Sequence, residues 1–192
     1  GLSDYPSDPG CMNPDDRVEA DEQPVPICAN QTDDDQDGLT DFPADPGCIA
    51  ASFGSEEDLC GPGIGIQEYI FGTPSVIAST GDAQASESLN SADLSCGTRE
   101  HAERIFYYRN PYQGTITLRT DYPETEILTA VYMRSTCTST NSELGCDSGS
   151  GNIPGRGRLV LEDVPPGDFY VIVDTSSGDP GVFRLGIEHV RI

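Results

Sequence analysis

The chain of 192 residues contains no lysine and no tryptophan, and its ten basic side chains are all arginine, against 33 acidic ones. The formal net charge is therefore −23. Binding nucleic acid requires basic groups that neutralise phosphates, so this balance argues against a nucleic-acid partner, and against anionic membrane surfaces. No stretch approaches the ~20 apolar residues of a membrane span. The lack of tryptophan also weakens an interpretation of the chain as a carbohydrate-binding module.

Sequence patterns typical of catalysis are missing as well. The two histidines, His101 and His189, do not lie in a metal-binding H-E-x-x-H arrangement. There is no Gly-x-Ser-x-Gly nucleophile elbow and no C-x-x-C zinc spacing. Residues 146–149 read more simply as a polar turn beside a cysteine than as a protease nucleophile loop. We therefore expect no enzyme active within this chain.

Charge and apolar content divide the chain near residue 60. Residues 1–60 carry sixteen acidic side chains and one basic one, a charge of −15, whereas residues 61–192 carry −8. The first segment has few apolar side chains, so it cannot bury enough surface to offset its conformational entropy. Its like charges also oppose compaction unless cations neutralise them. Bound metal and disulfides are what a small unit with little core needs.

The densest group of carboxylates lies at residues 33–37, where aspartates alternate before Gly38. A hard cation such as calcium needs six to eight oxygens at about 2.3–2.6 Å, which alternating aspartates on a turning loop supply. Residues 1–11 repeat residues 38–48 at a constant offset of 37. The N-terminal segment, residues 1–60, is therefore predicted to be a calcium-binding repeat array with an incomplete first copy.

The cysteine count supports an array that starts within a repeat. Seven cysteines leave one over if the others pair, and Cys11 is the expected one, because the equivalent of Cys28 would precede Gly1. We expect a piece of a longer chain; a bridge from Cys11 to another subunit is the alternative. So many cysteines indicate an oxidising compartment, and secretion or cell-surface display would provide free calcium for weak sites.

After a linker at residues 61–65, the pattern from residue 66 onward changes to short β-type runs separated by turn residues. Strands are predicted at residues 75–79, 104–109, 115–120, 127–134, 158–162, 169–174 and 182–189. Ile116 and Leu118 should point inward, and residues 170–173 suit a central strand covered on both faces. Residues 83–89 fit one or two helical turns. The predicted fold is mostly β, an irregular calcium-stapled N-terminal repeat segment plus an antiparallel jelly-roll-like β-sandwich at residues 66–192.

The segment from Cys28 to Cys48, with its D-x-D-x-D-G-x-x-D pattern, resembles the thrombospondin type 3-like calcium repeats of secreted bacterial proteins. The resemblance implies that the ion is Ca²⁺. Its implied ligands are Asp33, Asp35, Asp37, Asp41, Asp45 and the backbone carbonyl of Leu39. The twelfth loop position, a bidentate glutamate in EF-hands, is Ala44 here, so further oxygens are expected from Glu56 and Asp58. The candidates in the first copy are Asp4, Asp8, Glu19 and Asp21.

Residues 131–137, 143–147, 158–161 and 166–174 resemble the bacterial pre-peptidase C-terminal domain, and the match spans Cys96 to Ile192. That family implies a jelly-roll-like sandwich appended to secreted peptidases and other exoproteins.

The expected disulfides are Cys28–Cys48, which would close the calcium loop, Cys137–Cys146, which would close a loop between strands, and Cys60–Cys96, paired by elimination.

Three hypotheses for the function follow. The first is a non-enzymatic extracellular module, in which calcium makes the repeats a rigid stalk and the sandwich mediates adhesion or assembly. The second is the accessory region of a secreted hydrolase that targets a polymer such as collagen or polysaccharide. The third is a subunit of an extracellular filament that self-associates through its N-terminal segment.

Overall fold

The computed structural model describes residues 5–11, 24–61, 64–69, 71–81, 96, 103–177 and 180–192. The chain divides into two compact units, Gly1–Ile66 and Gln67–Ile192. We call them the repeat unit and the sandwich unit. The division falls next to the linker that the sequence predicts at residues 61–65.

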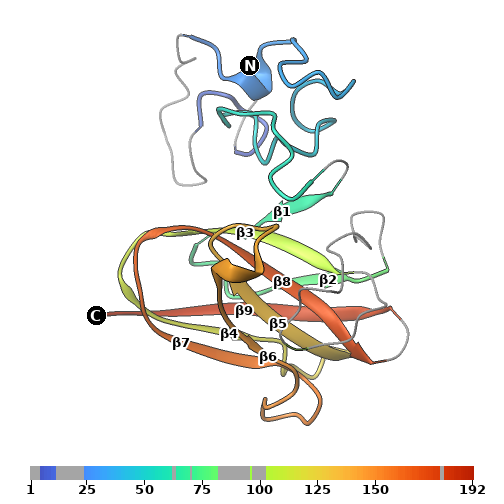
Figure 1. Ribbon diagram of the computed structural model, residues 1–192, viewed down its shortest axis with the longest axis vertical. Helices are drawn as coiled ribbons and strands as arrows, with labels where there is room; N and C mark the ends of the chain where they lie inside the picture. The colour runs from blue at the N-terminus through green and yellow to red at the C-terminus, as the bar shows by residue number, and fades with distance from the viewer. Residues whose placement is uncertain are drawn as a thin grey trace. The chain divides into compact units, whose positions relative to one another are not determined.

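The repeat unit consists of turns and bends, with one short 3-10 helix, η1 (Ile27–Ala29), in its described residues (Figure 1, blue to teal). Its buried apolar side chains are small or few: cysteines, Ala50, Ala51, Ile49 and Ile64. Backbone hydrogen bonds hold the loops together instead, such as Cys28 N to the Phe53 carbonyl (3.2 Å) and Phe42 N to the Cys28 carbonyl (3.1 Å). The segment thus folds without a sizeable hydrophobic core.

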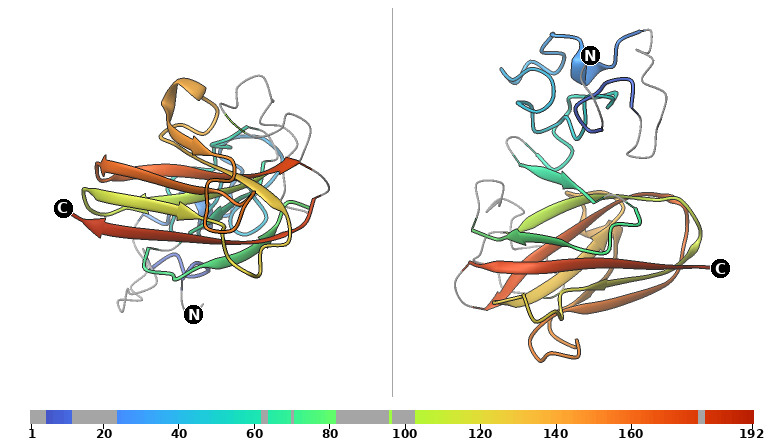
Figure 2. Two further views of the ribbon diagram at one scale, coloured as in Figure 1. Left: turned by 90° about the horizontal axis from the view of Figure 1, so that it is seen from below. Right: turned by 180° about the vertical axis from the view of Figure 1, so that it is seen from behind.

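The sandwich unit is built from strands of two sheets (Figures 1 and 2). The strands are β1 (Ile66–Glu68), β2 (Val76–Ser79), β3 (Arg104–Asn110), β4 (Gly114–Arg119), β5 (Leu128–Arg134), β6 (Glu143–Asp147), β7 (Arg158–Val164), β8 (Gly167–Ser177) and β9 (Val182–Arg191). The 3-10 helix η3 (Thr140–Ser142) precedes β6. One sheet has the order β1-β3-β8-β5-β6 and the other β2-β9-β4-β7. The neighbouring strands β2–β9, β3–β8, β4–β7, β4–β9, β5–β6 and β5–β8 pair antiparallel.

Strand alternation decides which side chains form the core between the sheets. Ile116 and Leu118 of β4 are fully buried, as predicted, and so are Phe183 and Leu185 of β9. They belong to one apolar cluster that also takes residues from β3, β5, β7 and β8. The centre of the five-stranded sheet is β8, whose residues 170–173 are buried throughout. The prediction of a central strand covered on both faces is confirmed.

All seven predicted strands exist in the structure. Two further strands, β1 and β6, were not predicted. β1 is only three residues long, and β6 reads Glu-Leu-Gly-Cys-Asp, which lacks a β-type alternation and forms a strand because it pairs with β5. The helical turns predicted at residues 83–89 lie outside the described residues. Within the part of the chain that the structure describes, no helix has the length and apolar character needed to cross a bilayer.

Two disulfides bear on the predicted pairs. Cys28 pairs with Cys48, as expected, with an S–S distance of 2.04 Å. Cys96 pairs with Cys146, with their Cα atoms 6.1 Å apart. The predicted Cys137–Cys146 and Cys60–Cys96 pairs are therefore wrong, although Cys60 and Cys137 are also disulfide-bonded.

The strand register gives the reason for the first error. Cys146 lies within β6 opposite Tyr132, whereas Cys137 follows the end of β5 at Arg134. A disulfide requires Cα atoms about 4.4–6.8 Å apart, and short separation along the chain does not place these two cysteines side by side. The second error follows from the first, because it was made by elimination.

Candidate metal centre

Local hydrogen bonds between aspartates and the backbone shape residues 33–41, which we call the acidic loop. Asp33 accepts from Gln36 N at Oδ1 (2.7 Å) and from Gly38 N at Oδ2 (3.1 Å). Asp37 accepts from Leu39 N at Oδ1 (2.7 Å). Gly38 has a φ of 97°, a left-handed conformation that glycine adopts without strain. The alternating sequence therefore winds into successive tight turns that bring its carboxylates together.

Two groups of three carboxylates result. Asp33, Asp35 and Asp37 form one group, and Asp37, Asp45 and Asp58 form the other. In each group, one oxygen of every member lies within 4.8 Å of an oxygen of the others. Asp37 belongs to both groups, so the acidic loop is joined to two aspartates that follow it in sequence. Oxygen atoms at such spacings are suited to a hard divalent cation.

Asp45 is the most informative member, because its side chain is only 2% exposed. Its Oδ1 accepts from Gly47 N (2.7 Å), but its buried Oδ2 meets no hydrogen-bond donor among the described residues. Burial raises the pKa of this carboxyl to about 6, with smaller contributions from the nearby carboxylates of Asp37, Glu56 and Asp35. A buried carboxylate oxygen without a donor is costly, and a bound cation would remove that cost.

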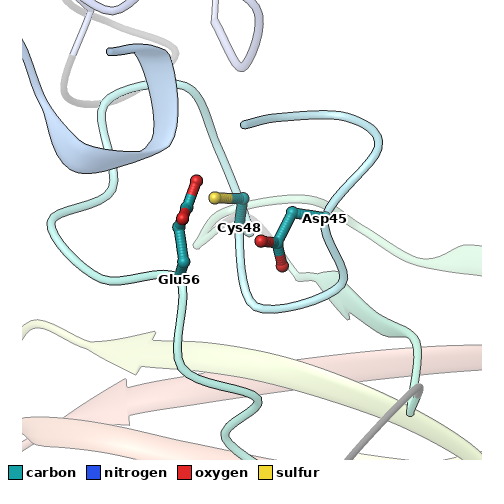
Figure 3. Close-up of side chains that lie close together, drawn as sticks. All are labelled: Asp45, Cys48 and Glu56. Carbon is teal, nitrogen blue, oxygen red and sulfur yellow. The ribbon is translucent and has the colours of Figure 1, made fainter. Parts of the chain in front are cut away.

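A third group contains Asp45, Cys48 and Glu56, all buried (Figure 3). The Cys48 sulfur is bonded to Cys28 and is thus not available as a thiolate ligand. Both oxygens of Glu56 are engaged by the backbone: Oε2 accepts from Asp34 N (2.6 Å) and Oε1 from Asp41 N (3.0 Å). The group is therefore a buried junction of the fold rather than a sulfur-containing metal site.

The other predicted ligands differ in position. Asp41 accepts from Gln31 N at Oδ2 (2.8 Å) and belongs to none of these groups, but its buried Oδ1, like Asp45 Oδ2, has no hydrogen-bond partner among the described residues. Leu39 lies on the surface. Asp58 is half-buried, in the second group. Asp4, Glu19 and Asp21 lie outside the described residues.

The first copy of the repeat reproduces the turn around Asp45. Asp8 is buried, and its Oδ1 accepts from Gly10 N (2.8 Å), as Asp45 accepts from Gly47 N (2.7 Å). The offset of 37 residues therefore relates equivalent structure as well as equivalent sequence.

In the sandwich unit, the structure places two of the residues weighed for catalysis, Asp147 and His189. Asp147 Oδ2 accepts from the backbone N–H groups of Gly149 (3.1 Å), Ser150 (3.0 Å) and Arg158 (2.8 Å); Cys146 and Asp147 are the last residues of β6, and the chain bends at residues 148–149. The ring of His189 stacks on Tyr112, with centroids 6.2 Å apart, and burial lowers its pKa. His101 lies outside the described residues.

Sequence reasoning did not foresee the two backbone hydrogen bonds of Glu56 or the sharing of Asp37 between two groups. A signal was present, because a Glu-x-Asp pattern recurs at the same offset of 37, at residues 19–21 and 56–58. This recurrence lies outside the acidic loop and indicates that these residues belong to the same structural unit.

Comparison with family models gives no match, and no curated protein matches the chain. Among solved structures, the chain is similar to the pre-peptidase C-terminal domain of a collagenase from Bacillus anthracis, with 10% identity and a TM-score of 0.38, over 59% of this chain and 87% of that one. It is also similar to CorA, a surface-associated copper-binding protein of Methylomicrobium album BG8, with 8% identity and a TM-score of 0.37, over 66% and 98%. The function is therefore inferred from the residues themselves.

Proposed function

We propose that this chain is a non-enzymatic, secreted calcium-binding module, in which Ca²⁺ rigidifies the repeat unit and the sandwich unit serves adhesion or assembly. The observation that carries the calcium site is the buried Asp45 side chain, which lies in a carboxylate group with Asp37 and Asp58 and whose Oδ2 has no donor among the described residues. A divalent cation would supply the missing partner and neutralise part of the −15 charge of residues 1–60.

The donor set favours calcium over softer metals. The proposed ligands would be carboxylate oxygens of Asp33, Asp35, Asp37, Asp45 and Asp58, whereas zinc and copper prefer imidazole or thiolate ligands. Calcium also tolerates irregular arrangements of six to eight oxygens, whereas magnesium requires a near-ideal octahedron and retains water. The disulfides indicate an oxidising compartment, where calcium is abundant.

The sandwich unit offers a surface for adhesion on the outer side of its four-stranded sheet. Ile77 of β2, Val160 of β7 and Val190 of β9 are exposed there, by 64%, 50% and 68%. The strand pairs Ile77–Arg184, Thr117–Val160 and Thr115–Val190 place them on the face opposite to the core. Each lies opposite a polar residue and they do not form one contiguous patch; in the proposal they would be single contact points for a polymer or another protein.

The calcium site is tested by titrating Ca²⁺ into metal-free protein while amide hydrogen exchange is followed by mass spectrometry. We expect saturable heat in calorimetry and slower exchange in residues 24–61, with little change in residues 103–177. The Asp45→Asn variant keeps the acceptor for Gly47 N but loses the charge, so it should fold and bind calcium more weakly. Glu57→Gln, an exposed neighbour, is the matched control. Absence of heat and of protection at millimolar Ca²⁺ would refute the site.

A further inference from the structure

The Glu56 side chain connects the two ends of the acidic loop. It is 2% exposed, and its oxygens accept from Asp34 N at 2.6 Å and Asp41 N at 3.0 Å. We propose that Glu56 is a positioning residue, which holds the acidic loop against Asp45 and Asp58 without coordinating the cation itself. This inference rests on the calcium site proposed above.

The backbone of Glu56 also packs closely against Gly47, in the turn that follows Asp45. Gly47 lies directly beneath the Glu56 carbonyl, and a Cβ at residue 47 would overlap with that oxygen. The turn that carries Asp45 therefore packs against the backbone of Glu56, and Asp58 follows two residues later. Glu56 thus links three separate parts of the carboxylate groups: the acidic loop through its side chain, Asp45 through its backbone contact, and Asp58 through the chain.

Charge supports the same role. The Glu56 carboxylate lies beside Asp45, and an oxygen of each is within 4.8 Å of the other. A second buried anion beside Asp45 is repelled by it, and charge-assisted hydrogen bonds to that anion offset the repulsion. The two backbone N–H groups provide that satisfaction. The Asp45 Oδ2 atom, in contrast, has no donor among the described residues, so Asp45 offers the oxygen that a cation would take.

The Glu56→Gln variant tests the role. Glutamine keeps one carbonyl acceptor but replaces the other with an NH₂ group that faces a backbone N–H, so one end of the acidic loop is released. Loss of a residue that orients metal ligands typically weakens metal affinity about 10–100-fold. We expect a Ca²⁺ dissociation constant larger by that factor for Glu56→Gln in calorimetry. The control Glu57→Gln removes the same charge from an exposed position and should stay within about twofold of the wild type.

A spectroscopic measurement separates positioning from coordination. Eu³⁺ substitutes for Ca²⁺, and its luminescence lifetimes in H₂O and D₂O count the water molecules bound to the ion. If Glu56 only positions the ligands, saturated Glu56→Gln has the same water count as the wild type. One or two additional waters would show that Glu56 is itself a ligand and would overturn the inference.

Two further outcomes are decisive. Equal Ca²⁺ affinity in Glu56→Gln and Glu57→Gln overturns the positioning role while leaving the calcium site intact. Failure of the wild type to bind Ca²⁺ or Eu³⁺ overturns both proposals.

If Glu56→Gln does not fold, Glu56→Asp serves instead: it keeps the charge but is too short to reach both donors. It should lose affinity if the reach of the side chain matters, and unchanged affinity in Glu56→Asp would contradict the inference.

Discussion

The two units of this chain are stabilised in different ways. In the described part of the sandwich unit, sixteen buried residues, nearly all from the strands of the two sheets, form one apolar cluster. In the repeat unit, the buried side chains include cysteines, alanines and the carboxylates of Asp8, Asp45 and Glu56. The hydrophobic effect grows with the apolar area buried, so it serves the first unit far better than the second. The repeat unit depends on covalent links, backbone hydrogen bonds and, we propose, a cation.

The treatment of buried charge shows the same contrast. In the sandwich unit, Asp121 pairs with Arg119 (2.7 Å) and Arg134 pairs with Glu143 (3.2 Å). Residues 1–60 contain sixteen acidic side chains and one arginine, Arg17, so most of their carboxylates have no cationic side chain available within the segment. The sandwich unit thus pairs some of its acidic side chains with its own arginines, whereas residues 1–60 offer one arginine for sixteen acidic side chains.

The largest effect is expected from a substitution in the core of the sandwich unit, which should leave the repeat unit folded. Phe183 is fully buried and packs edge-to-face against Phe106, with centroids 6.2 Å apart. Phe183→Ala should lower the free energy of unfolding of the sandwich unit by about 3–5 kcal/mol. Urea titrations read by hydrogen exchange would measure this. Val160→Ala, on an exposed position, should change it by less than about 0.5 kcal/mol. If residues 24–61 lost as much protection from hydrogen exchange as the sandwich unit, the two units would not be stabilised independently.

The converse experiment removes the covalent link of the repeat unit. Cys28 and Cys48 are 20 residues apart, and the entropy of closing such a loop corresponds to about 3 kcal/mol. The double variant Cys28→Ser with Cys48→Ser should therefore expose residues 24–61 to exchange, while residues 103–177 keep their protection. The contrast fails if both units lose protection together.

A smaller effect is expected at Gly47. Its replacement by alanine would force the added methyl group against the Glu56 carbonyl, and such overpacking costs about 1–3 kcal/mol. Gly54→Ala is the matched control in the same unit, because no atom lies within 4 Å of its Cβ position. We expect lower urea resistance of residues 24–61 in the first variant only. Equal behaviour of the two variants would contradict the tight packing at Gly47.

The last comparison concerns the dependence of stability on pH, whose sign should differ between the units. Without calcium, burial raises the pKa of Asp45 from 3.8 to about 6. The folded repeat unit then holds a proton that the unfolded chain has released, so its stability should fall as the pH rises from about 4 to about 6. Asp45→Asn should abolish this dependence, and a slope that persists in the variant would assign it to another group.

Asp147 should give the sandwich unit a dependence of stability on pH with the opposite sign. Burial acts to raise its pKa, but hydrogen bonds from Ser150, Arg158 and Gly149 outweigh burial, and the pKa is lowered from 3.8. Its contribution to stability is present above that value and is lost as the pH falls further. Urea midpoints of both units, measured in metal-free protein between pH 3 and pH 7, would show whether the two slopes differ in sign.

Much of this fold was predictable because local patterns decide it. The alternation of Ile116 and Leu118 fixed an inward face, and the apolar run at residues 170–173 marked the central strand. The strand β6 was missed because its five residues have no such alternation, and the disulfide partner of Cys146 was missed because it comes from a residue 50 positions away. Separation along the sequence says little about which segments meet in space.

By itself, the sequence determined the division of the chain into two parts, the β-rich class of the second, the repeat offset of 37 and the acidic loop. These follow from composition and short-range periodicity, which act through local backbone preferences and the drive to bury apolar side chains. Only the tertiary structure decided that Asp37 joins two carboxylate groups, that Asp45 is buried with one oxygen that finds no donor in the described part of the chain, and that Glu56 faces backbone donors. Those features depend on contacts between distant loops, whose geometry no local pattern encodes.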